Sequence, residues 1–212
     1  MQKKFVLLTA AGLAGLAGLA AASWGVVASD VETPDYTLIS KSGKIEVRRY
    51  PAMIVAETTV VGSREEAIKR GFRIIADYIF GNNLSDDKVA MTAPVMQQSS
   101  QKIAMTAPVM QQGEGNSWTV RFVMPAEYTM ETLPKPGNPQ VVLVEVPEKR
   151  YAAIRFSGLA GQTSLRKHEA ELKRFIADNG LTSASPVEYA FYNPPWTLPF
   201  MRRNEMLLEL AG

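Results

Sequence analysis

The stretch IEVRRYPAMIVAETTVVGSREEAIKRGFRIIADYIFG, from Ile45 to Gly81, decides the fold class because its hydrophobic period changes in the middle. Its first part alternates apolar and charged residues and becomes rich in β-branched residues over 53–61, which predicts two strands. Ser63 and Glu66 have the spacing of a capping box at the start of a helix. Apolar residues then recur at helical spacing until Gly81, which ends the helix. The stretch therefore predicts a strand–strand–helix unit.

The rest of the chain repeats this order of elements. A second helix is predicted within 158–179, ended by Gly180. Alternating and β-branched patterns predict five more strands, at 118–124, 141–146, 150–157, 187–192 and 206–210. The Pro-rich segment 134–139 separates two halves of similar order, and the connections within each half are short. We therefore expect an α+β fold in which a mainly antiparallel sheet is flanked by two helices.

An internal repeat lies between the first helix and the middle of the chain. Residues 88–98, KVAMTAPVMQQ, recur as residues 102–112, KIAMTAPVMQQ, with one difference, Val89 against Ile103. Each copy is expected to be strand-like up to the residue before Pro94 or Pro108, because proline forces that residue to be extended. The short period predicts that the two copies form neighbouring strands or strand ends. Their methionines could fill a core or supply a weak sulfur ligand, and we favour the core role.

The N-terminus has the build of an export signal. Lys3 and Lys4 precede an uncharged run, 5–29, which is rich in Leu, Ala, Gly and Val. Residues 1–28 are therefore interpreted as a signal peptide or a membrane anchor, and we favour the signal peptide because the run is only mildly apolar. Both readings place residues 30–212 outside the cytoplasm, in a periplasmic or similar compartment. Residues 29–43 are polar and aperiodic and are expected to form a linker before a single domain over 44–212.

Composition excludes several kinds of site. The chain has no cysteine and one histidine, so thiolate sites and a zinc site with two His ligands are excluded, and hydrolytic chemistry finds little support. Of its 23 Lys and Arg residues, two are Lys3 and Lys4, which leaves 21 against 21 Asp and Glu in the rest of the chain. A neutral body of this kind does not predict nucleic-acid binding. No Gly-rich phosphate loop or nucleophile elbow is present.

Several ordered motifs together resemble those of the SOUL haem-binding protein family, over about Tyr36 to Leu210. The residues that carry the resemblance are IEVRRYP at 45–51, GF at 71–72 with YIFG at 78–81, both AMTAPV copies, FVMP at 122–125, YNPPW at 192–196 and RRNE at 202–205. The resemblance implies a distorted antiparallel β-barrel or sheet built from two pseudo-repeats, each with one helix. It also implies binding of haem or another tetrapyrrole in a shallow apolar site.

One strip of the first predicted helix matches the chemistry of that ligand. Phe72, Ala76 and Phe80 fall at four-residue spacing and are flanked by Lys69 and Arg73. A haem is a flat apolar macrocycle with two carboxylates, so apolar area beside two cations suits it. The resemblance places the family's pocket on this helix, with Lys69 and Phe72 at pocket positions, whereas Asp77 stands where some members carry a second basic residue. An ordinary amphipathic helix boundary would give the same spacing, and both readings remain open.

His168 is the only histidine and falls beside the apolar face of the second predicted helix. It could be an axial haem ligand or a hydrogen-bonded side chain between helix and sheet, and we favour the second role. Where some members of the family carry a histidine ligand in the first strand, this chain has Arg49.

Three functions follow from these patterns. The first is an extracytoplasmic tetrapyrrole-binding protein for carriage, buffering or sequestration, with no catalytic residue and no metal site of its own. The second is a non-enzymatic interaction module that binds a protein or another apolar ligand through the Pro-Pro-Trp loop, which carries Trp196 and Phe200. The third and least favoured is an esterase or similar enzyme on the same scaffold.

Overall fold

The computed structural model describes residues 31–84 and 100–212. Residues 31–212 form a compact unit of their own, separate from residues 1–30. The expected signal peptide or anchor and the first repeat copy, 88–98, lie outside the described residues. Over the described ranges, no helix has the length and hydropathy needed to cross a bilayer.

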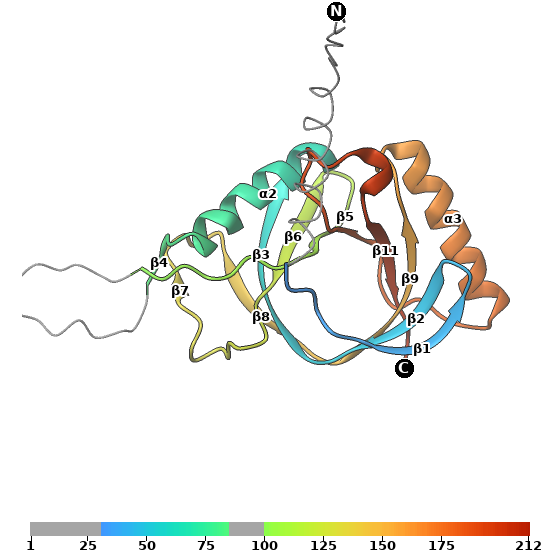
Figure 1. Cartoon of the computed structure of the whole chain (residues 1–212), viewed down its shortest axis with the longest axis horizontal. Helices are drawn as coiled ribbons and strands as arrows, with labels where there is room; N and C mark the ends of the chain where they lie inside the picture. Colours follow the sequence, from blue (N-terminus) through green and yellow to red (C-terminus); the bar gives the residue numbers. More distant parts are fainter. Residues whose placement is uncertain (1–30, 85–99) are drawn as a thin grey trace, which may run out of the picture. The chain divides into compact units, whose positions relative to one another are not determined.

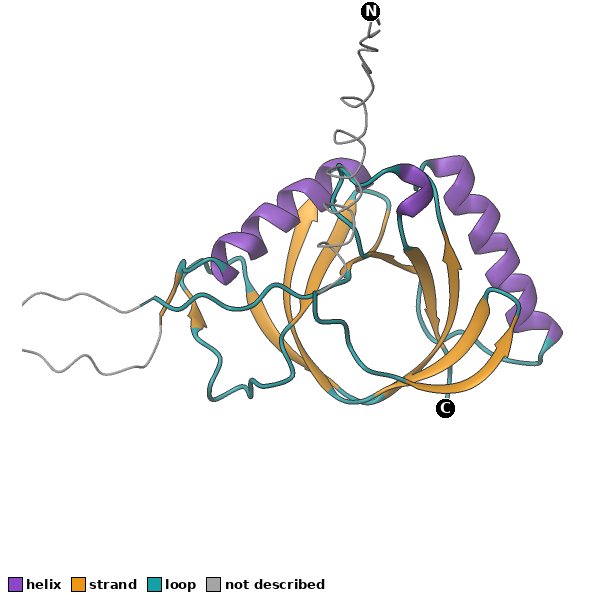
Figure 2. Cartoon of the chain, in the orientation of Figure 1, coloured by secondary structure: helices purple, strands orange, loops and turns teal. Residues whose placement is uncertain are grey.

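The domain consists of a large antiparallel sheet and two long helices (Figures 1 and 2). The helices are α2 (Arg64–Ile79) and α3 (Gln162–Asp178), and a 3-10 turn, η1 (Pro199–Met201), precedes the last strand. The nine strands of the sheet are β1 (Thr37–Ser42), β2 (Ile45–Tyr50), β3 (Met53–Val61), β5 (Val109–Glu114), β6 (Ser117–Val123), β8 (Val142–Val146), β9 (Lys149–Phe156), β10 (Glu188–Phe191) and β11 (Asn204–Glu209). A separate small pair joins β4 (Asn83–Leu84) to β7 (Lys135–Pro136).

The strand order reveals the two pseudo-repeats. The sheet reads β1-β2-β9-β11-β10-β5-β6-β3-β8, and every pairing is antiparallel. Each half contributes three adjacent strands, and the halves meet where β10 pairs with β5. One early strand of each half pairs with the other half, because β2 pairs with β9 and β8 pairs with β3. The sheet curls into a half-barrel, so the predicted α+β fold with two pseudo-repeats is confirmed.

Both helices cover the convex face of the curled sheet (Figure 1). The capping box predicted for α2 is present, since the Ser63 side chain accepts from the Glu66 backbone N–H and the Glu66 carboxylate accepts from the Ser63 N–H. Helix α2 packs on β3 and β6 through a fully buried set that includes Ile75, Tyr78 and Phe122. A Cβ at Gly71 would lie 2.5 Å from Val120 Cγ2, so this glycine lets the helix approach the sheet closely.

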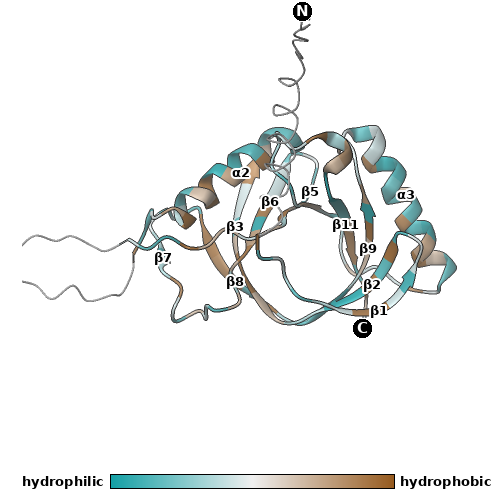
Figure 3. Ribbon diagram, viewed as in Figure 1, coloured by the Kyte–Doolittle hydropathy of each residue, from teal (hydrophilic) through white to brown (hydrophobic). Residues whose placement is uncertain are grey.

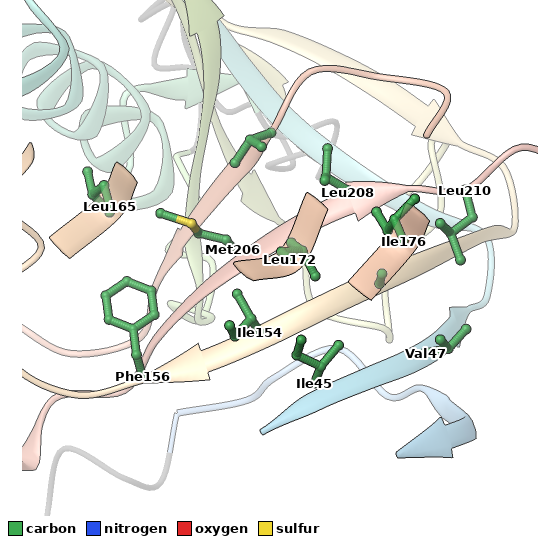
Figure 4. Close-up of a cluster of buried hydrophobic side chains, with 12 residues drawn as sticks. Ile45, Val47, Ile154, Phe156, Leu165, Leu172, Ile176, Met206, Leu208 and Leu210 are labelled. Carbon is green, nitrogen blue, oxygen red and sulfur yellow. The ribbon is translucent and has the colours of Figure 1, made fainter. Parts of the chain in front are cut away.

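Helix α3 closes a second core over the other half of the sheet (Figure 4). Leu165, Leu172 and Ile176 point from the helix onto apolar side chains of β2, β9 and β11. The outward side of α3 is mostly hydrophilic, as expected for a helix that buries one face (Figure 3). The two helices therefore rest on separate cores of one sheet.

Two local expectations were wrong. The polar segment expected as a linker contains strand β1, which pairs with β2. Its six residues are all exposed, so no hydrophobic alternation marks it in the sequence. In the second repeat copy the strand follows Pro108 instead of preceding it. Before the proline, the Ala107 N–H donates to the Glu32 carbonyl and the Thr106 hydroxyl donates to the Val123 carbonyl, so this part forms an isolated bridge instead of a ladder.

Candidate functional site

The predicted strip on α2 is an exposed surface. Phe72 is 37% exposed and Phe80 is 57% exposed, while Ala76 is buried between them. The Phe72 ring contacts the buried Phe122 ring of β6, with centroids 5.4 Å apart. The strip therefore offers one anchored and one free aromatic ring on a helix that is held rigidly against the sheet.

The two cations of the strip are available for an anionic ligand. Lys69 and Arg73 are exposed, and neither forms an ion pair with a carboxylate of the described part of the chain. The Arg73 Nε donates to the Lys69 carbonyl at 3.4 Å, which holds the guanidinium beside the preceding turn. Asp77 instead accepts from the Asn82 side chain at 2.6 Å, beyond the C-terminal end of the strip. The strip thus combines exposed apolar area with two exposed cations, and it contains no histidine.

The His168 side chain packs between α3 and β9. Its Nδ1 lies 2.8 Å from the Ser164 carbonyl, so the ring donates there in the tautomer that carries the Nδ1 proton. The imidazole stacks on Phe156 with centroids 4.1 Å apart and an interplanar angle of 14°. This places His168 against Phe156 of β9, on the side of the sheet that α3 covers, and not with the strip on α2.

The concave face of the sheet holds a small cavity of about 50 Å³ that the sequence did not predict. Three tyrosines, Tyr50, Tyr151 and Tyr192, line it together with apolar side chains such as Met53 and Leu207. Tyr50 and Tyr151 meet edge to face, with centroids 5.8 Å apart. Burial raises the pKa of Tyr50 to about 12, so its hydroxyl stays protonated at neutral pH.

A buried ionic network supports one wall of this cavity. The Arg48 guanidinium donates to both carboxylate oxygens of Glu205, at 2.7 and 3.2 Å, and these residues are 2% and 1% exposed. The Tyr192 hydroxyl and the Arg203 side chain also donate to Glu205. Burial alone would raise the pKa of Glu205, but the hydrogen bonds and charges of Arg48 and Arg203 outweigh burial and lower it. The family-like motifs at 45–51, 192–196 and 202–205 therefore converge on one network.

A second ionic group lies on the same face. The Arg121 side chain donates to Glu57 at 2.7 Å and to Glu188 at 3.3 Å. Burial raises the pKa of Glu188, against the opposing charge of Arg121. Lys149 pairs with Glu209 at 2.7 Å. The two cations that line the cavity are thus each matched by a carboxylate.

The cavity adjoins a larger open groove of about 740 Å³. Both hollows share five wall residues, which are Pro34, Met53, Val123, Val146 and Pro147. The groove lies where the chain turns corners from β2 into β3 and from β8 into β9. Four carboxylate side chains line it, from Glu32, Asp35, Glu131 and Glu145.

The Pro-Pro-Trp loop between β10 and β11 presents aromatic side chains to solvent. Trp196 is 81% exposed and Phe200 is 73% exposed. The Arg202 guanidinium donates to the carbonyls of Thr197 and Pro195, which fixes the loop from within. The loop is therefore ordered by its own arginine, and its aromatic rings remain free for a partner.

Within the described ranges, no group of three or more His, Asp or Glu side chains is placed so that it could hold a metal ion. Of the repeat methionines, Met110 lines the concave cavity, and Met91 and Met96 lie outside the described residues.

Comparisons with known proteins agree with this architecture. A family model described as SOUL heme-binding protein matches residues 31–209. Human heme-binding protein 2 is 26% identical over 187 residues, which cover 85% of this chain and 87% of the human protein. Among solved structures, the EcmrR C-terminal domain superposes with a TM-score of 0.55 at 11% identity, covering 83% of this chain and 98% of that one. A protein described as a hydrolase from Listeria innocua superposes with a TM-score of 0.52 at 14% identity, covering 82% and 94%. At these identities, the two structures establish the fold alone.

Proposed function

Because this chain belongs to the SOUL heme-binding protein family, we propose that it binds haem or a related tetrapyrrole on the exposed strip of α2, as a binding protein and not as an enzyme. The observation that carries this assignment is the pairing of Phe72 and Phe80 with Lys69 and Arg73 on one rigid helix. The aromatic rings would pack on the macrocycle, and the two cations would hold its carboxylates.

The strip also determines the expected mode of binding. Because His168 is stacked on Phe156 under the other helix, the α2 strip holds the ligand without an axial bond from it. Affinity then depends on apolar burial and on two exposed cations, each of modest effect. We expect a weak to moderate complex with a broad spectral change.

A titration of hemin into the purified domain, residues 31–212, followed at the Soret band, tests this proposal. Saturable binding at micromolar hemin that weakens on Phe72→Asp supports the strip. Leu38→Asp is a matched control, because Leu38 is another half-exposed apolar residue, 50% accessible, on the edge strand β1. The absence of any saturable change at micromolar hemin would refute tetrapyrrole binding.

We further propose that the domain acts outside the cytoplasm in carriage, buffering or sequestration of the ligand. Lys3 and Lys4 followed by the uncharged run 5–29 support export. A fusion of residues 1–35 to a reporter that is active only after export tests this role. A reporter that stays inactive and cytoplasmic would refute it.

The second candidate function is recognition of a protein through the Pro-Pro-Trp loop. The exposure of Trp196 and Phe200 favours it, because large aromatic side chains are frequent anchors of interfaces. It replaces the first proposal if hemin does not bind.

A further inference from the structure

The groove at the mouth of the half-barrel has the dimensions of a ligand site. Its volume of about 740 Å³ lies in the usual range of small-molecule pockets, roughly 300–1,000 Å³. Prolines form its corners, with Pro51 at the turn into β3 and Pro147 at the turn into β9, so the rim is built from restricted backbone. Apolar side chains such as Met53, Met124 and Tyr128 face the same space.

The charge of the groove has one sign. The residues that line it include no Lys, Arg or His. Within the described part of the chain, none of the four lining carboxylates forms an ion pair. Glu32 is held in place because its Oε1 accepts from the Ala126 N–H at 3.0 Å. The low-dielectric walls and unmatched carboxylates together produce a negative potential within the groove.

Aromatic rings in the groove and in the cavity beside it favour a cation. Tyr128 lines the groove itself, while Tyr50 and Tyr151 line the adjoining concave cavity, and the faces of such rings attract positive charge. The cations of that cavity do not oppose this, since Arg121 is matched by Glu57 and Glu188, and Lys149 by Glu209.

The placement of the carboxylates distinguishes an organic cation from a metal ion. A metal ion needs several ligands that converge on one point, and no three acidic or histidine side chains of the described residues do so. The four carboxylates are instead distributed around the rim, on segments 31–35, 123–131 and 145–147. Such a distribution suits a charge that is delocalised over a large apolar molecule.

We propose that this groove is a second ligand site that binds an apolar organic cation, such as a quaternary or delocalised aromatic cation. The site is separate from the strip on α2 and takes a ligand of opposite charge. A porphyrin with two carboxylates is repelled by the groove and attracted by the strip, so the two sites do not compete.

The test uses two triarylmethane dyes of similar size, the cation crystal violet and a sulfonated anionic analogue, titrated into the domain by fluorescence or absorbance. We expect saturable binding of crystal violet at micromolar concentration, which weakens as salt is raised, and no saturable binding of the sulfonated dye. Neutralising the exposed carboxylates in the triple variant Asp35→Asn, Glu131→Gln, Glu145→Gln should weaken crystal violet by about tenfold, since each contributes modestly at an exposed site.

Glu127→Gln is the matched control. Glu127 is an exposed carboxylate on the same loop as Glu131 but does not line the groove, so this variant should bind crystal violet as the unmodified domain does. Equal binding of both dyes, no binding of crystal violet, or equal affinity in the triple variant would each overturn the proposal. A Lys- and Arg-rich peptide that displaces the dye at a much lower concentration would assign the groove to a protein partner instead.

Hemin titrations of the same variants separate this proposal from the first one. Unchanged hemin binding in the triple variant supports two independent sites. If the triple variant alters hemin binding and Phe72→Asp does not, the tetrapyrrole lies in the groove and the cation site is refuted. If hemin fails to bind at all while the dye pattern holds, only the tetrapyrrole assignment fails.

Discussion

The strip on α2 and the groove at the mouth of the half-barrel are both apolar surfaces of one small domain, yet they carry opposite charge. The strip places Phe72 and Phe80 beside two cations, whereas the groove places Met53 and Tyr128 among four carboxylates. Apolar area contributes to the affinity of almost any hydrophobic ligand, and the adjacent charges decide which ligand is accepted. Two apolar surfaces of one fold can therefore suit ligands of opposite charge.

The largest effect is expected on the stability of the sheet, which carries both the strip and the groove. Glu205→Ala leaves the Arg48 guanidinium buried and without its bidentate partner, and should lower the free energy of unfolding by about 3–5 kcal/mol. Binding of hemin and of crystal violet should then fall together near the unfolding transition, which chemical denaturation of the variant locates. Glu148→Ala is the control, because the exposed pair of Glu148 with Arg49 should contribute less than about 1 kcal/mol. Equal stability of the two variants would contradict the role given to the buried pair.

Acidic pH should reduce the stability that the Arg48–Glu205 network contributes to the folded domain. The folded-state pKa of Glu205 lies below its ordinary value of 4.5, because Arg48 and Arg203 outweigh burial. The stabilisation is therefore complete above that value and is lost as the pH falls through the lower folded-state pKa. Denaturation measured between neutral and acidic pH should show this loss in the unmodified domain and a shallower one in Glu205→Gln. A parallel pH dependence in both proteins would assign the acid sensitivity to other carboxylates.

A loss of hemin affinity without a loss of crystal violet affinity is expected when the apolar part of the strip is changed. Phe72→Asp removes the anchored ring and adds an anion, so hemin affinity should fall about 30-fold, or ~2 kcal/mol. Crystal violet affinity should stay unchanged, because Phe72 does not line the groove. Circular dichroism confirms that the variant is folded. If both ligands are lost in a folded variant, the two regions are not independent.

A smaller loss of hemin affinity is expected when the two cations of the strip are replaced. Lys69→Glu with Arg73→Glu should weaken hemin by about tenfold, since exposed cations contribute modestly and are screened by salt. The effect should shrink at high salt, which a titration series over ionic strength measures. A loss that does not depend on salt would indicate that the variant acts through helix stability instead.

The smallest effect on binding is expected from His168→Ala. The ring packs on Phe156 and its Nδ1 bonds to the Ser164 carbonyl, so the variant should lose about 1 kcal/mol of stability and keep its hemin affinity within about twofold. Abolished hemin binding in a folded His168→Ala domain would establish an axial role and move the tetrapyrrole away from α2.

The contrast between the strip and the groove also explains which features could be predicted from the sequence. The strip was predicted because its residues lie on one helix, where a spacing of three or four residues guarantees a common face. The groove was missed because its four carboxylates come from separate segments of the chain, which no local pattern connects. Arg48 and Glu205 pair across 157 residues, a distance over which no local pattern operates. Strand β1 was missed because Leu38 and Ile39 are both exposed and leave no alternation to detect.

The exchange of strands β2 and β8 between the two halves has a consequence for folding. Strand β2 is synthesised early, but its residue Ile45 pairs with Ile154 of β9, which is synthesised much later. Strand β3 likewise pairs with β8 of the second half. Such distant pairings have a high loop-closure cost and are expected to fold slowly. Neither half can complete its own sheet, so a chain that stops in the segment 134–139 would leave the edges of β2 and β3 without partners. Unpaired strand edges recruit other chains, and we expect the separate halves to aggregate or to assemble with each other when mixed.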